Sequence, residues 1–352
     1  MRKFITLLLT ITILTPAWAQ QKKAKNIILM IGDGMGMAQI YAGLTAKKGK
    51  PALERCQYIG LSKTNSADNY ITDSAAGATA FATGKKTYNG AIAVDMQKQP
   101  LETILEKAEK NGLATGLVAT CSITHATPAS FIAHQPSRNM HEAIAADFLK
   151  TDIDVFIGGG RKFFEKREDK KDLIKALKKN KYQLPNNLEE LAKIKKGKIA
   201  ALLYEEHPPR MLDNRGEMLA KSTQKALEIL NQNEDGFFLM IEGSQIDWGG
   251  HANESDYIVT EMVDFDNVIN QVLDFVDQNG ETLLVITADH ETGGYGLNGG
   301  DLEKGEVEGA FTTKKHTGVM VPVFAYGIGA ENFIGIYHNH TLFNKMLAAW
   351  KM

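Results

Sequence analysis

Several largely apolar runs of the sequence end in side chains that could bind a metal ion or move a proton. The runs and the side chains that follow them are 26–31 with Asp33, 114–119 with His125 and Thr127, 237–241 with Glu242, Asp247 and His251, and 282–287 with Asp289 and His290. If the runs are parallel strands, their carboxyl ends meet at one edge of a sheet, where open α/β sheets bind ligands. The side chains are therefore expected to lie together.

Each of these side chains has an ordinary structural explanation when it is considered alone. Asp33 in a glycine-rich turn, for example, is typical of an Asx turn. Together, however, the carboxylates would repel one another, and buried charges must be paired or coordinate a metal. Mixed aspartate and histidine ligation without cysteine suits Zn²⁺, whereas an all-oxygen set suits Mg²⁺. Two such ions about 4 Å apart can support in-line displacement at phosphorus.

A candidate nucleophile lies in residues 71–84, which read ITDSAAGATAFATG. The alanine-rich run favours a helix whose first turn holds Ser74. That turn offers unpaired backbone N–H groups and the positive end of the helix dipole, which suit phosphate. Considered alone, Ser74 is more often an N-cap than a nucleophile, because serine is a preferred cap.

The elements that must position these groups alternate between apolar runs and amphipathic segments. Further runs lie at 154–157 and 321–326, and their continuous hydrophobicity predicts strands buried on both faces. Residues 258–276 place apolar side chains on one face of a helix, and residues 101–111 predict another. The alternation predicts a three-layer α/β/α fold with a large, mostly parallel central sheet.

The domain organisation follows from composition along the chain of 352 residues. Residues 1–19 combine a basic start, a short apolar run and a small-x-small site, which predicts a cleaved secretory signal peptide and a periplasmic or secreted protein. The apolar run is shorter than the roughly 20 residues of a membrane span, so no membrane anchor is expected. Residues 20–352 predict a single domain, with a charged helical insertion near 161–198 and a glycine-rich surface loop at 293–309.

Charge and cysteine usage exclude some classes of function. A net charge of −2 gives no general attraction for nucleic acid. The spacing of Cys56 and Cys121 matches no metal or redox motif, and both a disulfide and two free thiols are compatible with export. The remaining histidines are not expected to bind metal. His134 lies in the segment 124–138 and is expected to pack or support the site, and the others are His141, His207, His338 and His340.

Six segments resemble motifs of the alkaline phosphatases, in the family's order and over most of the chain after residue 19. They are IGDGMG (31–36), TDSAAGATAFATG (72–84), THATPASFIAHQPSR (124–138), EGSQIDWGGH (242–251), TADHET (287–292) and KHTG (315–318). The resemblance implies a phosphomonoesterase that releases inorganic phosphate from small phosphate monoesters. It also implies a phosphoserine intermediate, two Zn²⁺ ions and one Mg²⁺ ion.

The resemblance further implies a role for each matching residue. Ser74 is expected to be the nucleophile. Arg138 is expected to bind the phosphate, and Asp73 is expected to orient Arg138. The expected metal ligands are Asp247, His251 and His316 for the first zinc, Asp33, Asp289, His290 and Ser74 for the second, and Asp33, Thr127 and Glu242 for magnesium.

Two residues near the expected magnesium site depart from some bacterial members of the family. His125 and Trp248 stand where those members have aspartate and lysine, which leaves the metal preference of this site open. A homodimer is the family habit, but the chain is short, so a monomer is also open. The alternative functions are a phosphodiesterase or phosphomutase of the same superfamily, and a non-catalytic metal- or phosphate-binding protein. The presence of Ser74, Thr127 and Arg138 favours the phosphatase.

Overall fold

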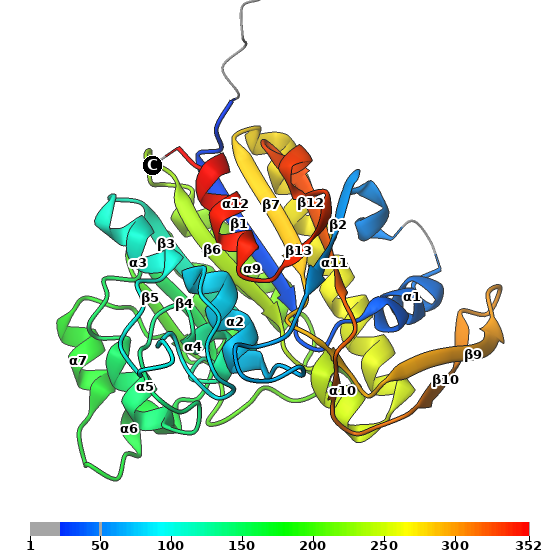
Figure 1. Ribbon diagram of the computed structural model, residues 1–352. Coiled ribbons are helices and arrows are strands. Elements are labelled where there is room, and N and C mark those ends of the chain that lie inside the picture. Colours follow the sequence, from blue (N-terminus) through cyan, green and yellow to red (C-terminus); the bar gives the residue numbers. More distant parts are fainter. Residues whose placement is uncertain (1–21, 49–50, 352) are drawn as a thin grey trace, which may run out of the picture.

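A computed structural model describes residues 22–48 and 51–351, which form helices on both faces of a central sheet (Figure 1). Within these residues the sheet has nine strands in the order β13-β2-β12-β7-β1-β6-β3-β4-β5. Only β12 runs antiparallel to its neighbours β2 and β7. The strands are β1 (Asn26–Gly32), β2 (Tyr58–Lys63), β3 (Ala114–Ser122), β4 (Val155–Gly159), β5 (Ile199–Leu202), β6 (Phe237–Gly243), β7 (Thr282–Thr287), β12 (Val321–Gly327) and β13 (Gly335–His338). The predicted three-layer fold and mostly parallel sheet are confirmed.

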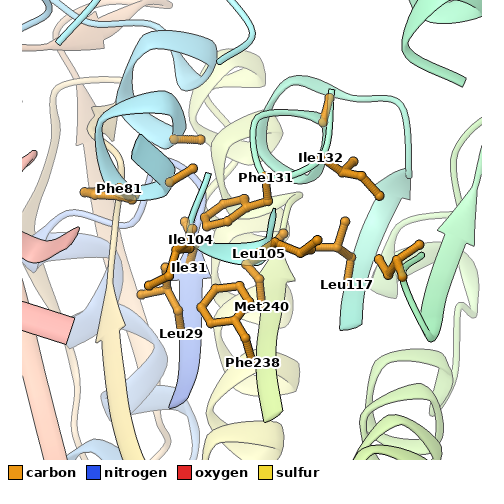
Figure 2. Packing of buried hydrophobic residues seen from close by; sticks show 14 of the residues in the cluster. Leu29, Ile31, Phe81, Ile104, Leu105, Leu117, Phe131, Ile132, Phe238 and Met240 are labelled. Atoms are coloured by element: carbon orange, nitrogen blue, oxygen red, sulfur yellow. The ribbon is translucent and has the colours of Figure 1, made fainter. Parts of the chain in front are cut away.

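Strand β1 shows why the sheet is buried on both faces. Successive side chains of a strand point to opposite faces, so Ile27, Leu29 and Ile31 join one hydrophobic core, and Ile28 and Met30 join the other. The helices that cover the first core include α2 (Ser74–Thr83), α3 (Ile104–Lys110), α4 (Ala126–Ala129) and α12 (Thr341–Ala349). Those that cover the second core include α1 (Met37–Ala46), α9 (Met218–Leu230) and α11 (Ser255–Asn279). Figure 2 shows side chains of α2 and α3 over β1 and β6 in the first core.

The strand register brings the predicted polar groups to one edge of the sheet. Ile31 of β1 is paired with Glu242 of β6 on one side and with Thr287 of β7 on the other. Ala119 of β3 is paired with Glu242 as well. The strands therefore end together, and the segments that follow β1, β3, β6 and β7 leave from the same edge.

The glycine-rich segment 293–309 was expected to be a surface loop, and this expectation is wrong. It forms most of a hairpin of β9 (Tyr295–Asp301) and β10 (Glu306–Phe311), which projects from the body of the molecule (Figure 1). Leu297, Val307 and Phe311 contact the second core. Glycines weaken a strand signal, and the hairpin exposes most of its polar side chains, so its pattern resembled a loop.

The remaining segments are short. The charged residues near 161–198 include α6 (Lys162–Glu165), α7 (Leu173–Lys179) and α8 (Leu188–Lys193), and α5 (His141–Asp147) lies before them. Cys56 and Cys121 are buried free thiols in different cores, so they form no disulfide with each other. The predicted signal peptide lies outside the described residues. Among those described, no helix has the length and apolar character of a membrane span.

Candidate active site

Helix α2 places Ser74 at the edge where the strands end. The N-cap of this helix is Asp73, whose carboxylate accepts a hydrogen bond from the Ala76 N–H at 3.0 Å. The interpretation of Ser74 as the cap is therefore wrong, and its hydroxyl is free for other contacts in the first turn. Glycine at position 77 allows a close approach, because a Cβ atom there would lie 3.0 Å from Cβ of Asp289. The small residues of α2 thus let Ser74 approach the β7 end.

The Ser74 hydroxyl faces a buried group of acidic and imidazole side chains. Its Oγ lies 3.4 Å from Oδ1 of Asp33 and 3.3 Å from Nε2 of His290. Nε2 of His290 also lies 3.1 Å from Oδ2 of Asp289. All four residues are buried. The ligand atoms of Asp33, Asp289 and His290 all lie within 4.8 Å of one another, which is a geometry that can hold one metal ion.

A second group contains Asp247, His251 and His316, whose ligand atoms are also within 4.8 Å of one another. Asp247 and His251 lie four residues apart on α10 (Ile246–Ala252), so they share a helix face. His316 comes from β11 (His316–Thr317), which pairs with β8 (Glu291–Thr292). Glycine is required at position 34, where φ is +72° and a Cβ atom would lie 2.6 Å from Cα of Asp247.

The two imidazoles of this second group are oriented by backbone carbonyls. Nδ1 of His251 lies 2.6 Å from the Lys314 carbonyl, and Nδ1 of His316 lies 2.9 Å from the Thr72 carbonyl. A carbonyl only accepts hydrogen bonds, so each Nδ1 carries the proton and each Nε2 has a free lone pair. The two Nε2 atoms lie 3.1 Å apart. Two lone pairs at this distance need a cation between them, and carbonyl-oriented histidine is the usual arrangement around metals.

The charges of the site also call for cations. Burial, followed by the charges of Asp289, Asp247 and Glu242, raises the pKa of Asp33 well above its usual value. Burial raises the pKa of Glu242 to about 7. Burial opposes ionisation of Asp247, but the neighbouring imidazoles of His316, His290 and His251 hold the pKa of its carboxyl below the usual value. Oδ2 of Asp33 and Oδ2 of Asp289 are buried without hydrogen-bond partners. These donors fit divalent cations.

A third group surrounds Glu242 at the end of β6. The hydroxyl of Thr127, from the first turn of α4, lies beside this carboxylate. Sγ of Cys121 lies 3.3 Å from Oε2 of Glu242, and the ligand atoms of Cys121, His125 and Glu242 are within 4.8 Å of one another. Burial, with the charges of Glu242 and Asp33, raises the pKa of the Cys121 thiol.

Arg138 lies between Asp73 and His125. Its Nη1 donates to Oδ2 of Asp73 at 3.0 Å, and its Nη2 lies 3.3 Å from Nε2 of His125. Burial and the Arg138 charge lower the pKa of His125 to about 3, so its imidazole is neutral and accepts from the guanidinium. Trp248, on α10, stacks edge-on against His125 with ring centroids 6.0 Å apart. The guanidinium is therefore held from two sides.

The structure adds supporting residues that sequence reasoning missed. The Thr292 hydroxyl donates to Oδ1 of Asp247 and lies 3.2 Å from Nδ1 of His290. It therefore links the two groups that contain these residues. Buried Glu291 accepts hydrogen bonds from Gln39 and Thr317, which ties β8 and β11 to α1. His207 contacts Trp248 edge-on with ring centroids 4.8 Å apart. Thr292 and Glu291 lie inside the TADHET motif and could have been flagged from it, whereas His207 carries no sequence signal.

Other histidines lie in contacts outside the three groups. His134 pairs with Glu106 at 2.9 Å, and His141 stacks on Phe163 with ring centroids 4.6 Å apart. His338 and His340 stack on each other near the end of β13. None of these four belongs to a metal-binding group among the described residues.

Comparison with known proteins agrees with this geometry. A family model for alkaline phosphatase matches residues 24–306. Alkaline phosphatase 3 of Bacillus subtilis (strain 168) is 38% identical, and the match covers 91% of this chain and 74% of that protein. The chain belongs to the alkaline phosphatase family. It is therefore an enzyme of the phosphate-monoester hydrolase type.

Solved structures of this family have the same fold. Alkaline phosphatase from the Antarctic bacterium TAB5 is 42% identical, with a TM-score of 0.89, covering 95% of this chain and all of that one. A single-residue mutant of the same enzyme has Mg bound in its M3 site. Alkaline phosphatase of Escherichia coli (strain K12) is 31% identical over 93% of this chain and 86% of that protein. Membership of the family thus rests on sequence and structure together.

Proposed function

We propose that the protein hydrolyses phosphate monoesters in two in-line steps through a phosphoserine at Ser74. The observation that carries the proposal is the position of the Ser74 hydroxyl. It lies in the first turn of a capped helix, within 3.4 Å of Asp33 and 3.3 Å of His290. An ordinary buried serine does not face a group of candidate metal ligands.

The chain's own residues bind and orient the phosphate. The N–H groups at the start of α2 and the guanidinium of Arg138 are donors for its non-bridging oxygens. Asp73 holds Arg138 in place and caps the same helix. In the first step the Ser74 oxygen forms a bond to phosphorus as the ester oxygen leaves. In the second step water oxygen replaces the serine oxygen, so the configuration at phosphorus is retained.

The proposal includes three divalent cations. Two zinc ions, when bound, supply Lewis-acid stabilisation of oxygen charge and a water that ionises near neutral pH. Asp247, His251 and His316 would hold one ion, and Asp33, Asp289, His290 and the Ser74 oxygen would hold the other. A third cation, magnesium by resemblance to the family, would be held by Asp33, Thr127 and Glu242.

The decisive experiment compares p-nitrophenyl phosphate with bis(p-nitrophenyl) phosphate as substrates of the purified protein. The proposal expects a higher kcat/KM for the monoester and a phosphorylated Ser74 peptide after acid quenching. A preference for the diester would favour the phosphodiesterase alternative. No turnover with metals bound would favour a binding protein.

The remaining parts of the proposal concern export and oligomeric state. We propose that residues 1–19 direct export and are removed, which N-terminal sequencing of secreted protein tests. The residues assigned above all come from one chain. The proposal therefore expects activity from a monomer as well as from a homodimer, and light scattering of the active fraction distinguishes the two.

A further inference from the structure

Cys121 is a buried thiol that the proposed reaction does not use. It lies in β3, fully buried, with Sγ 3.3 Å from Oε2 of Glu242. Glu242 and Asp33 are the two carboxylates assigned above to the third cation. The thiol therefore lies beside one of the two carboxylates of that site.

Polar atoms around this thiol lack partners. Oε1 of Glu242, Oγ1 of Thr127 and Oδ2 of Asp33 are buried and make no hydrogen bond of good geometry within the described residues. Glu242, Thr127 and Asp33 have no exposed surface. Buried polar atoms are normally satisfied, so the unpaired oxygens of Glu242 and Thr127 beside this thiol indicate a ligand that binds to both oxygens and to the sulfur. A cation accepts lone pairs from carboxylate, hydroxyl and sulfur alike.

The identity of the donors distinguishes between cations. Mg²⁺ demands oxygen ligands in near-octahedral geometry and usually keeps several waters. Thiolate sulfur is a soft donor that favours Zn²⁺ over Mg²⁺. A sulfur beside the carboxylates replaces one oxygen or water position of a magnesium site with a donor that Mg²⁺ binds poorly. The imidazole of His125 at the same site adds no negative charge for a hard cation.

We propose that Cys121 Sγ is a ligand of the third cation and that this site prefers Zn²⁺ to Mg²⁺. The inference rests on the proposed function, because that function places a cation between Asp33, Thr127 and Glu242. When the cation binds, the thiol proton is released to solvent and the sulfur donates a lone pair to the metal. This assignment replaces magnesium at the third site and leaves the two histidine-containing sites unchanged.

Co²⁺ provides a direct test, because a thiolate bound to Co²⁺ absorbs in the near ultraviolet and oxygen or imidazole ligands do not. The full-length metal-free protein is titrated with Co²⁺ up to three equivalents, in the wild type and in Cys121→Ser and Cys121→Ala. Cys56→Ser is the matched control, since Cys56 is also a buried free thiol but belongs to no metal-binding group among the described residues. Circular dichroism confirms that each variant is folded.

The wild type and Cys56→Ser are expected to develop the thiolate band, and both Cys121 variants to lack it while keeping the visible bands of the histidine sites. Competition between Zn²⁺ and Mg²⁺, followed by metal analysis, is expected to show a third zinc in the wild type. In Cys121→Ser the preference for zinc is expected to fall by at least about 10-fold, because loss of a direct ligand costs no less than the 10- to 100-fold loss that is usual for a partner supporting a ligand.

Two results would overturn the inference. One is a near-ultraviolet band that persists in Cys121→Ser, or that never forms in the wild type. The other is wild-type protein that keeps one magnesium in the presence of excess zinc. Hydrolysis of p-nitrophenyl phosphate, measured on the same samples, separates the two proposals. Activity without the thiolate band rejects only the sulfur ligand, whereas the band without activity rejects only the phosphatase mechanism.

Discussion

Asp73 caps helix α2 and also holds Arg138, and the substitutions Asp73→Asn and Asp73→Ala distinguish these two roles. One carboxylate oxygen caps α2 through the Ala76 N–H, and the other accepts from Arg138 at 3.0 Å. Asparagine is as good an N-cap as aspartate, whereas alanine is not. Asp73→Asn therefore removes the charge that holds Arg138 and leaves the helix start intact.

The expected magnitudes follow from these contacts. The side chains of Asp73 and Arg138 are 20% and 24% exposed, so the ion pair is partly screened by solvent. We assign it about 1 kcal/mol, which corresponds to about a fivefold loss of kcat/KM. Asp73→Ala loses this amount and also about 1 kcal/mol of stability from the missing cap.

The assay is kcat/KM for p-nitrophenyl phosphate and the inhibition constant of inorganic phosphate, with thermal unfolding as the control for the cap. A double-mutant cycle with Arg138→Ala measures the coupling between the two residues. Additive effects of Asp73→Asn and Arg138→Ala would refute the role of Asp73 in positioning Arg138. Equal melting temperatures for Asp73→Asn and Asp73→Ala would refute its role as the cap.

Four further outcomes are expected. Ser74→Ala abolishes the phosphorylated peptide while metal analysis still finds the ions; phosphorylation elsewhere would reject the nucleophile. Chelation by EDTA stops phosphate release from a monoester, and divalent cations restore it; indifference to EDTA would reject the metal assignment. Gly34→Ala destabilises the fold by about 2–4 kcal/mol in denaturant unfolding, because the left-handed conformation and the contact with Asp247 both oppose a side chain; wild-type stability would contradict this. Burial raises the pKa of Glu109 from 4.5 to about 7. The contribution of Glu109 to the free energy of unfolding is therefore fully present below pH 4.5, and it is lost as the pH rises through 7. Glu109→Gln should exceed the wild type by about 1 kcal/mol at pH 8, after allowance for its partial exposure, and match it near pH 4.5.

Much of the fold was predictable because its signal is local. The runs that became β1, β3, β6 and β7 are largely apolar and buried along their whole length, which is typical of strands covered on both faces. The helix over 258–276 was also predicted, and α11 contains it and ends at the left-handed C-cap Gly280. The β9–β10 hairpin was missed because glycines and exposed polar residues hide its alternation. The short strands β2, β5 and β13 were not expected, since they are defined by pairing with distant strands.

The candidate site was also predictable in part. The types of residue at the strand ends, and the family motifs that contain them, were enough to name Ser74, Asp33, Arg138 and the histidines of KHTG and TADHET. What they could not specify was orientation. The tautomers of His251 and His316 depend on the carbonyls of Lys314 and Thr72, and the Thr72 carbonyl is 244 residues from its partner.

The sequence by itself thus determined the central strands of the sheet, the edge where the polar groups gather and the residue types of the site, because strand burial and strand ends are read from neighbouring residues. The tertiary structure alone decided that Asp73 rather than Ser74 caps α2. It also decided that the thiol of Cys121 lies beside Glu242, 121 residues along the chain. Contacts of this kind depend on how strands from distant segments are placed in register, and no local pattern contains that information.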